Sequence, residues 1–275
     1  MFERSGVYLV VLAGAFLMAL PFLWTLSVSV RPPGGSESVP IQWLPSSVTW
    51  SEYQTVLSQY GLGRFTLNSL LVASLAGLGT MAASALLGYA WAVFEFPGRR
   101  LLFSLLLLLM ALPGQVMIIP VYLIWSKLSA IDTYVPLTVP FFLGTASAFG
   151  IFLVRQYFLT IPRDFRDVAE LDGAGPLTIL LRIYMPLGLP AIVTAGLLAF
   201  ITSWNEVFLP LLYLNTQSKS TVQLGLLDMM RGQFGTTPPE LLAAGSVISM
   251  IPILIVFIVA QRWLVNGFVG TGLKG

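Results

Sequence analysis

Apolar and polar residues fall in long alternating blocks along the chain. Six apolar runs of about twenty residues or more are separated by polar segments rich in Pro, Gly, Ser and charge. About 20 consecutive apolar residues in an α-helix cross the hydrocarbon core of a bilayer. The pattern predicts an all-α, polytopic membrane protein with about six transmembrane helices in a single transmembrane domain, 1–275. The runs are 6–30, 66–94, 101–125, 134–154, 191–214 and 241–263.

The first apolar run, 6–30, could be either a transmembrane span or a signal peptide, because both begin with an apolar segment near the N-terminus. Residues 6–30 are longer than the apolar region of a typical signal peptide, and no convincing small-residue cleavage site follows them. The run is therefore interpreted as an uncleaved span. The loop after it, 31–63, is too polar to span and too short for a core of its own.

Composition narrows the function. Of the 275 residues 56% are hydrophobic and 9% charged, whereas soluble domains carry about 25% charged residues. The absence of Cys and His excludes disulfides, imidazole catalysis and the common zinc and haem ligand sets. A net charge of +2 does not suggest nucleic acid. No G-x-x-x-x-G-K-[ST] sequence occurs, and no nucleophile–base pair stands out. These observations predict a protein that is not an enzyme and binds no metal or cofactor.

Positive residues predict the orientation. Cytoplasmic loops of membrane proteins carry an excess of Lys and Arg. Six spans with both termini cytoplasmic place nine Lys or Arg residues inside and five outside. The inside set is Arg4, Arg99, Arg100, Arg155, Arg163, Arg166, Arg182, Arg262 and Lys274; the outside set is Arg31, Arg64, Lys127, Lys219 and Arg231. Loops 31–63 and 215–240 are then outer loops, and 155–190 is cytoplasmic.

Two spans carry internal signals. Small residues recur at four-residue spacing in the second run, at Ser69, Ala73 and Gly77, which lets helix backbones approach closely. Ser84 and Gly88 repeat the spacing. The third run contains Pro113 and Pro120, and a proline inside a span kinks it.

The cytoplasmic segment 155–190 predicts a helix, a sharp turn and a second helix. Pro162 suits a first helical turn, and Asp164 near that N-terminus complements the helix dipole. Asp172-Gly173 ends the helix, because glycine adopts the left-handed conformation of a C-cap. Pro176 restarts it. An apolar stripe is expected at Leu177, Leu180, Leu181 and Tyr184, and Pro186 and Pro190 are expected to redirect the chain into the fifth span.

The residues Asp167-Val168-Ala169-x-x-Asp172-Gly173-Ala174, followed by Arg182 and Met185-Pro186, resemble the EAA loop of binding-protein-dependent ABC importer permeases. Two positions depart from that pattern: Asp167 stands where Glu is usual, and Val168 where Ala is usual. Phe96-Pro97-Gly98-Arg99-Arg100 and Trp204-Asn205-Glu206 are similar to the carbohydrate-uptake branch. The chain resembles the smaller, six-span permease of the maltose-type transporter.

The resemblance implies a role and a set of partners. The loop would be an EAA-type cytoplasmic coupling helix that docks on a dimer of ATPase subunits, which bind the ATP and Mg. Asp167 would pair with a basic residue of the ATPase. A second homologous permease, an extracytoplasmic solute-binding protein, a sugar and membrane lipid complete the partners, in a bacterial or archaeal plasma membrane. The candidate coupling residues are Asp167, Val168, Ala169, Glu170, Asp172, Gly173, Ala174, Arg182 and Pro186. The alternative is a hairpin that merely links two spans.

Trp204, Asn205 and Glu206 lie in the fifth apolar run and are candidates for the substrate path. An ionisable residue within a span is by default a functional candidate. Glu206 could bind sugar hydroxyls, or it could face neighbouring helices or outer water. Phe141 is one of several aromatic residues that could stack on sugar rings, although packing is the commoner role of such residues. Two other functions stay open: an ion-coupled secondary transporter using Glu206, and an ABC permease for a polyol or sugar phosphate.

Overall fold

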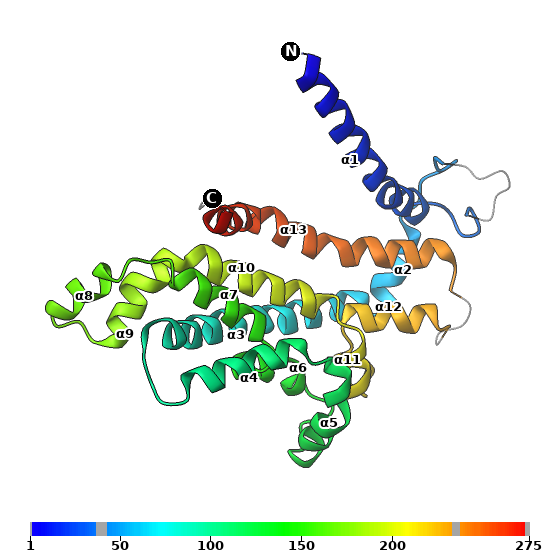
Figure 1. Cartoon of the computed structure of the whole chain (residues 1–275). Helices are drawn as coiled ribbons and strands as arrows, with labels where there is room; N and C mark the ends of the chain where they lie inside the picture. Colours follow the sequence, from blue (N-terminus) through cyan, green and yellow to red (C-terminus); the bar gives the residue numbers. More distant parts are fainter. Residues whose placement is uncertain (1, 37–42, 233–236, 273–275) are drawn as a thin grey trace. The chain divides into compact units, whose positions relative to one another are not determined.

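A computed structural model describes residues 2–36, 43–232 and 237–272 of the chain. All regular elements within these ranges are helices (Figure 1). The chain forms two compact units. One comprises residues 1–66 and 222–252, and the other 67–221 and 253–275. The all-α architecture predicted from the apolar runs is confirmed.

The first unit contains α1 (Phe2–Ser29), α2 (Ser51–Ser58), α12 (Val222–Met230) and the first turns of α3 (Leu62–Val93) and α13 (Pro239–Gly272). Its core is small and is centred on Val56, Leu62 and Ala244, which have no exposed surface. Most apolar side chains of α1 are exposed, as in a helix whose partners are lipid or another chain. Residues 37–42 and 233–236 of the two predicted outer loops lie outside the described residues.

In the second unit, α3 packs against α7 (Ala148–Phe158) and α10 (Met185–Trp204) through small residues. A Cβ atom built on Gly77 would lie 3.0 Å from the carbonyl oxygen of Gly196. A Cβ atom on Gly150 would lie 2.6 Å from the hydroxyl of Ser84. Ser69, Ala73 and Ser84 are buried. The predicted small-residue face of the second run is therefore the face on which helices meet.

We expect Gly77→Ala to destabilise the protein, because the added methyl meets a backbone carbonyl that cannot rotate away. Overpacking of this kind costs about 1–3 kcal/mol of unfolding free energy. Thermal melting in detergent measures the change. Gly14→Ala is the matched control, since its Cβ atom would meet nothing within 4 Å. A Gly77→Ala protein that melts at or above the wild-type temperature would contradict the close contact.

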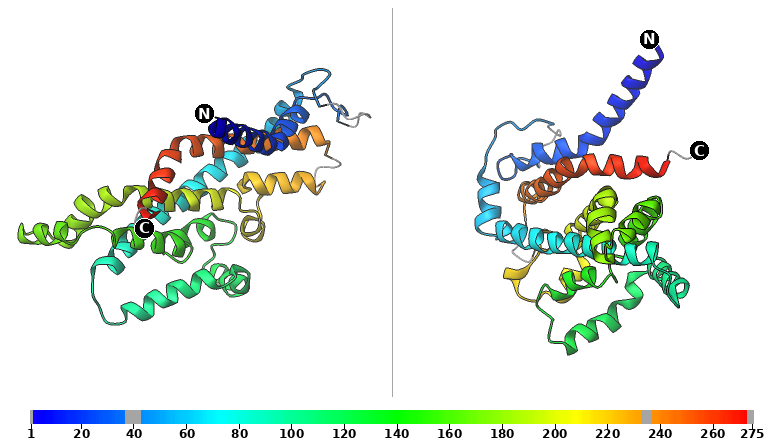
Figure 2. Two further views of the ribbon diagram at one scale, coloured as in Figure 1. Left: turned by 45° about the horizontal axis from the view of Figure 1, so that its top comes forward. Right: turned by 90° about the vertical axis from the view of Figure 1, so that its left-hand side faces the viewer.

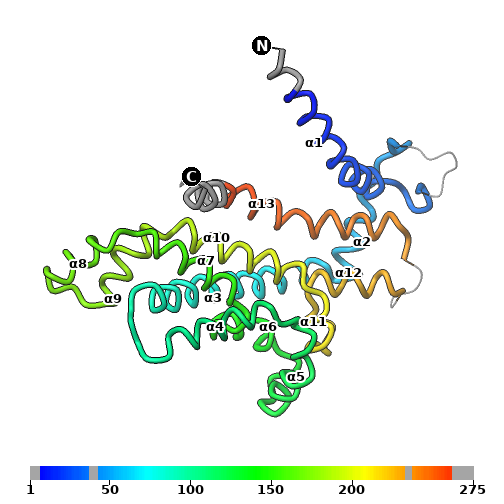
Figure 3. The backbone as a smooth tube through the Cα atoms, in the orientation of Figure 1, coloured from blue at the N-terminus to red at the C-terminus, as the bar shows by residue number. Residues whose placement is uncertain are grey.

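Four helical stretches in the described residues are long and apolar enough to cross a membrane: Val7–Ser29, Leu62–Val93, Pro176–Trp204 and Pro239–Gln261. They correspond to the first, second, fifth and sixth predicted runs. The third run forms α4 (Arg99–Ala111), then η1 (Gly114–Met117) and α5 (Ile118–Lys127), with a bend of 102° between the two limbs (Figure 3). The predicted proline break occurs at Pro113, where the backbone is extended. Pro120 lies inside α5 without interrupting it.

The fourth predicted run is interrupted as well. It forms α6 (Val135–Phe142) and α7, joined by a turn in which Gly144 has a φ of +81°. α7 continues to Phe158, four residues beyond the predicted end. The predicted number of six spans stays a prediction, because the third and fourth runs are broken helices and the fifth run, described below, is interrupted between α10 (Met185–Trp204) and α11 (Phe208–Tyr213).

The second unit has two polar ends. At one end Asn68 donates hydrogen bonds to the carbonyl oxygens of Ser218 and Ser220. At the other end, Arg99 and Arg155 donate to the carbonyl oxygen of Trp91. From Asn68 to Trp91, α3 is about 35 Å long at about 1.5 Å per residue, close to the thickness of a bilayer core. The two predicted cytoplasmic loops, entered at Arg99 and Arg155, therefore begin at the same end of the unit.

Candidate functional site

The coupling-loop candidate folds as the predicted hairpin. α8 (Asp164–Leu171) ends in a Schellman motif: Ala174 N–H donates to the carbonyl of Ala169 at 2.9 Å, and Gly173 N–H to that of Glu170 at 3.0 Å. This motif needs a left-handed residue, and Gly173 has a φ of +80°. The Asp172-Gly173-Ala174 sequence is thus explained by the backbone geometry of the turn.

The second arm of the hairpin differs from the prediction. α9 (Pro176–Ile179), the π-helical η2 (Leu180–Tyr184) and α10 form one continuous helix from Pro176 to Trp204. The prediction that Pro186 and Pro190 redirect the chain was wrong. Pro186 cannot donate to the preceding turn and would clash with it in an α-helix. The wider π turn just before it accommodates the proline, so the helix continues.

A buried aromatic cluster joins the hairpin to the helical bundle. The ring of Tyr184 lies 5.0 Å from that of Tyr89 on α3 and 5.3 Å from that of Phe158 on α7. The hydroxyl of Tyr89 donates to the carbonyl oxygen of Pro176 at 3.2 Å. All three rings are buried. A displacement of the hairpin must therefore move α3 and α7, because the close-packed rings cannot be compressed.

Beyond this cluster, α8 and α9 extend past the ends of the neighbouring helices (Figures 1 and 2). Phe165, Val168 and Leu171 on α8 are exposed, and Leu171 is 88% exposed. Only half of the apolar stripe predicted for the second helix of the hairpin is buried. Leu180 and Tyr184 are buried, whereas Leu177 and Leu181 are exposed. Because the buried pair already joins the bundle, the exposed pair remains for an external contact. Apolar side chains gathered on a protruding hairpin are typical of a protein interface.

Five of the nine coupling candidates meet at one place. They line an open hollow of about 530 Å³ on the hairpin; the five are Ala169, Asp172, Gly173, Ala174 and Arg182. Glu170 instead forms an ion pair with Arg166, which lies one helical turn earlier; the distance from Arg166 Nε to Glu170 Oε1 is 2.6 Å. Asp167, Val168 and Pro186 are exposed and lie outside the hollow. The small side chains of the Asp-Gly-Ala sequence leave space that a larger side chain of a partner can enter.

Glu206 lies at a break in the fifth run. α10 ends at Trp204, α11 (Phe208–Tyr213) follows, and Oε1 of Glu206 accepts the N–H groups of Phe208 at 2.8 Å and Leu209 at 3.2 Å. The carboxylate thus caps the N-terminus of α11, which a negative charge favours. Discontinuous helices within a transporter span commonly surround the substrate site.

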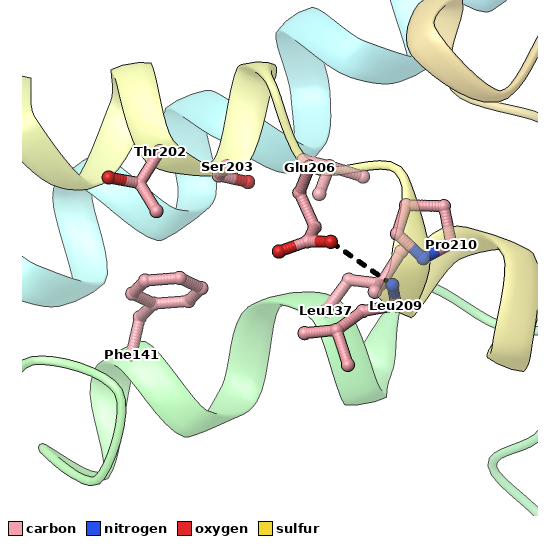
Figure 4. Close-up of a pocket in the computed structure, with 8 residues that line it drawn as sticks. Leu137, Phe141, Thr202, Ser203, Glu206, Leu209 and Pro210 are labelled. Carbon is pink, nitrogen blue, oxygen red and sulfur yellow. Dashed lines mark hydrogen bonds between the residues drawn. The ribbon is translucent and has the colours of Figure 1, made fainter. Parts of the chain in front are cut away.

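Around Glu206 a small hollow of about 40 Å³ combines polar and aromatic groups. Thr202 and Ser203 come from the end of α10, and Leu137 and Phe141 from α6 (Figure 4). One carboxylate oxygen of Glu206 bonds to the backbone of α11, and the other points toward the side of Thr202 and Phe141. A carboxylate, two hydroxyls and a ring are groups that bind a polyhydroxylated ligand. Sequence reasoning missed Thr202 and Ser203, although both directly precede Trp204.

The other two substrate-path candidates, Trp204 and Asn205, do not line this hollow. Trp204 is only 1% exposed and stacks on Phe200 with ring centroids 5.9 Å apart. Its indole is a packing group in this conformation and does not line the hollow. Asn205 is exposed and donates to the carbonyl oxygen of Ile201 at 2.8 Å, so it continues the hydrogen bonding at the end of α10.

An ionic clasp at the opposite end from the hairpin was not predicted. Oδ2 of Asp132 accepts from Lys219 Nζ and from the Thr216 hydroxyl, both at 2.7 Å. Oδ1 of Asp132 accepts the N–H groups of Asn215 and Thr216. The ammonium of Lys219 and these hydrogen bonds hold the pKa of Asp132 well below its usual range. The turn between α5 and α6 is thereby joined to the start of the predicted outer loop 215–240, next to α11.

Residues 81–269 match the family of binding-protein-dependent transport system inner membrane components. The chain belongs to this family. It is therefore the membrane permease component of such a system, located in the inner membrane, and works with a separate solute-binding protein. It is not an enzyme.

Curated relatives of the permease differ in their substrates. An osmoprotective compounds uptake permease protein from Synechocystis sp. is 33% identical over 99% of this chain and 93% of the relative. An sn-glycerol-3-phosphate transport system permease protein from Brucella abortus is 31% identical over 96% and 95%. An arabinooligosaccharides transport system permease protein from Halalkalibacterium halodurans is 28% identical over 95% and 93%.

A solved structure is similar along the whole permease. It is a bacterial ABC transporter involved in the import of the acidic polysaccharide alginate, with a TM-score of 0.82 and 25% identity over 95% of this chain and 97% of that one. Together with the relatives, it confirms the resemblance to ABC importer permeases of the carbohydrate-uptake branch.

Proposed function

We propose that this permease imports a neutral sugar or oligosaccharide by pairing with a second permease subunit above two ATPase subunits. The α8–α9 hairpin is the docking element for the ATPase. One observation carries the proposal: the hairpin exposes apolar side chains at its tip while its base is anchored to the bundle by buried rings. A merely connecting hairpin needs neither feature.

The coupling residues act in different ways. Leu171 and Val168 supply apolar contact area, and the hollow beside Gly173 receives a side chain of the ATPase. Asp167 offers an exposed charge for a basic partner residue. Arg166 and Glu170 hold each other, so their pairing stiffens α8. ATP-driven movement of the docked hairpin is passed through Tyr184 to α3 and α7, and shifts the balance between two access states.

The substrate class is inferred from the hollow at Glu206. Among the residues that the structure describes, its polar side chains are one carboxylate and two hydroxyls, and no Lys or Arg lines it. A carboxylate accepts hydrogen bonds from sugar hydroxyls but repels phosphate and uronate groups. We therefore favour a neutral sugar over the phosphorylated polyol of one relative and the acidic polysaccharide of the solved importer.

At about 40 Å³ the hollow is far smaller than the roughly 300 Å³ or more of a small-molecule site. The second permease subunit must therefore supply the rest of the substrate path. ATP-driven import also leaves no role for Glu206 as a proton carrier, so the ion-coupled alternative is not favoured.

Reconstitution tests the proposed function. The permease is placed in vesicles with the permease and ATPase subunits that co-purify with it, and labelled solutes are offered with the binding protein. We expect uptake of a neutral sugar only when ATP is supplied on the ATPase side. Glycerol phosphate and an acidic oligosaccharide serve as competing substrates. Uptake that persists without the ATPase and is abolished by an uncoupler would overturn the proposal.

A further inference from the structure

A basic cavity lies between the base of the hairpin and the bundle, apart from the docking face and from the hollow at Glu206. It has a volume of about 400 Å³, within the range of small-molecule sites. Its lining includes three guanidinium groups and one carboxylate, together with two buried rings: Arg99, Arg163, Arg166, Glu95, Phe158 and Tyr184. The lining therefore carries a net positive charge.

Two of the three arginines are held in place by the C-terminus of α3. Arg99 donates to the carbonyl oxygen of Trp91 at 2.7 Å, and Arg166 donates to that of Val93 at 3.3 Å. The last carbonyls of a helix lack internal donors and favour cations. Each guanidinium has five N–H donors, so these bonds leave several for a ligand. Among the described residues, the side chain of Arg163 forms no hydrogen bond or ion pair.

An apolar track begins beside this cavity. α4 starts at Arg99, and its leucines at Leu101, Leu105 and Leu108 are exposed along one face. The spacing of four and three residues makes a continuous stripe that runs away from the arginines along the helix. The cavity lies at the end of the bundle where α3 stops, and in the predicted topology this end is at the level of the cytoplasmic lipid headgroups. Basic groups at this level bind anionic headgroups, and the stripe suits an acyl chain.

We propose that this arginine cavity binds the phosphate headgroup of an anionic phospholipid, with one acyl chain lying along α4. Arg163 and Arg99 contact the phosphate, and Tyr184 offers a hydroxyl. The bound headgroup neutralises the like charges at the base of the hairpin. It thereby holds the hairpin against the bundle at the point where Tyr184 meets Phe158.

Lipid retention by the full chain, purified in detergent with its co-purifying subunits, tests this site. Native mass spectrometry is used to compare phosphatidylglycerol with phosphatidylcholine. We expect preferential retention of phosphatidylglycerol by the wild type. Binding should weaken about fivefold in Arg163→Gln and about 25-fold in the double variant with Arg99→Gln, since each basic group near an anionic surface contributes about that factor. Arg163→Lys should retain most of the preference.

Arg64→Gln is the matched control, because it removes an exposed arginine at the start of α3, away from the cavity. Arg99→Gln also removes the hydrogen bond to the carbonyl oxygen of Trp91 at the end of α3. The single variant Arg163→Gln, which removes no such bond, is therefore the decisive test. Equal retention of the two lipids, or unchanged retention in Arg163→Gln, would overturn the proposal. Displacement of phosphatidylglycerol by millimolar inorganic phosphate would overturn it too, since it would identify a free-phosphate site instead.

Discussion

Leu171→Asp is expected to separate the permease from its ATPase without unfolding the permease. Leu171 is 88% exposed in the free chain, so its replacement removes almost no internal contact. In the docked state the aspartate would lose the apolar burial of leucine and would have to shed water. The combined cost is about 2–4 kcal/mol, or a loss of about 30- to 1,000-fold in affinity. Co-purification of the ATPase with tagged permease measures it.

Leu44→Asp is the matched control for this experiment. Leu44 is 80% exposed and lies in the predicted outer loop 31–63, where no cytoplasmic subunit can reach it. Both variants should melt like the wild type in detergent. If Leu171→Asp retains the ATPase as well as Leu44→Asp does, the tip of α8 is not the docking face.

Two variants of Glu206 are expected to separate its binding role from its capping role. Glu206→Gln keeps an oxygen for the N–H groups of Phe208 and Leu209 but removes the charge. Glu206→Ala removes the cap as well, which costs about 0.5–2 kcal/mol of stability. A hydrogen bond to a charged group contributes about 1.5–3 kcal/mol, so both variants should lose about ten- to 150-fold in sugar uptake. Only the alanine variant should also melt earlier.

The binding role of Glu206 is measured by uptake of labelled sugar in the reconstituted transporter, and its capping role by the melting temperature in detergent. ATPase co-purification should be unchanged in both variants, because Glu206 and the hairpin lie at opposite ends of α10. Wild-type uptake by Glu206→Gln would show that the carboxylate serves only as the cap of α11.

The coupling hairpin was predictable to within a few residues because its signals are local. The acidic first turn of α8, Pro176 at the first turn of α9 and Asp172-Gly173 act on the backbone beside them, and the Schellman motif formed where Gly173 was expected. The prediction for Pro162 was wrong, because it lies before Arg163, the N-cap of α8, and not in the first turn. The effect of Pro186 was not predictable in the same way. A proline breaks an isolated helix, whereas here the π turn before it lets the packed helix continue.

The site at Glu206 was only partly predictable. Glu206 could be recognised in the sequence as an acidic residue within an apolar run. The break between α10 and α11 could not be predicted, because no proline or glycine occurs at residues 205–207. Phe141 lines the hollow because α6 packs beside the end of α10. The ionic clasp joins Asp132 to Lys219, which lies 87 positions later in the sequence. Contacts between such distant positions follow from the path of the whole chain.

By itself, the sequence determined the all-helical membrane class, the small-residue contact face of α3 and the elements of the hairpin. Each depends on periodicity or on neighbouring residues, which act through local backbone preferences and burial of apolar runs. Only the tertiary structure decided the break between α10 and α11 and the division of the hairpin's apolar stripe into a buried pair and an exposed pair. It alone gathered the arginines at the end of α3, because these outcomes depend on which helices pack together.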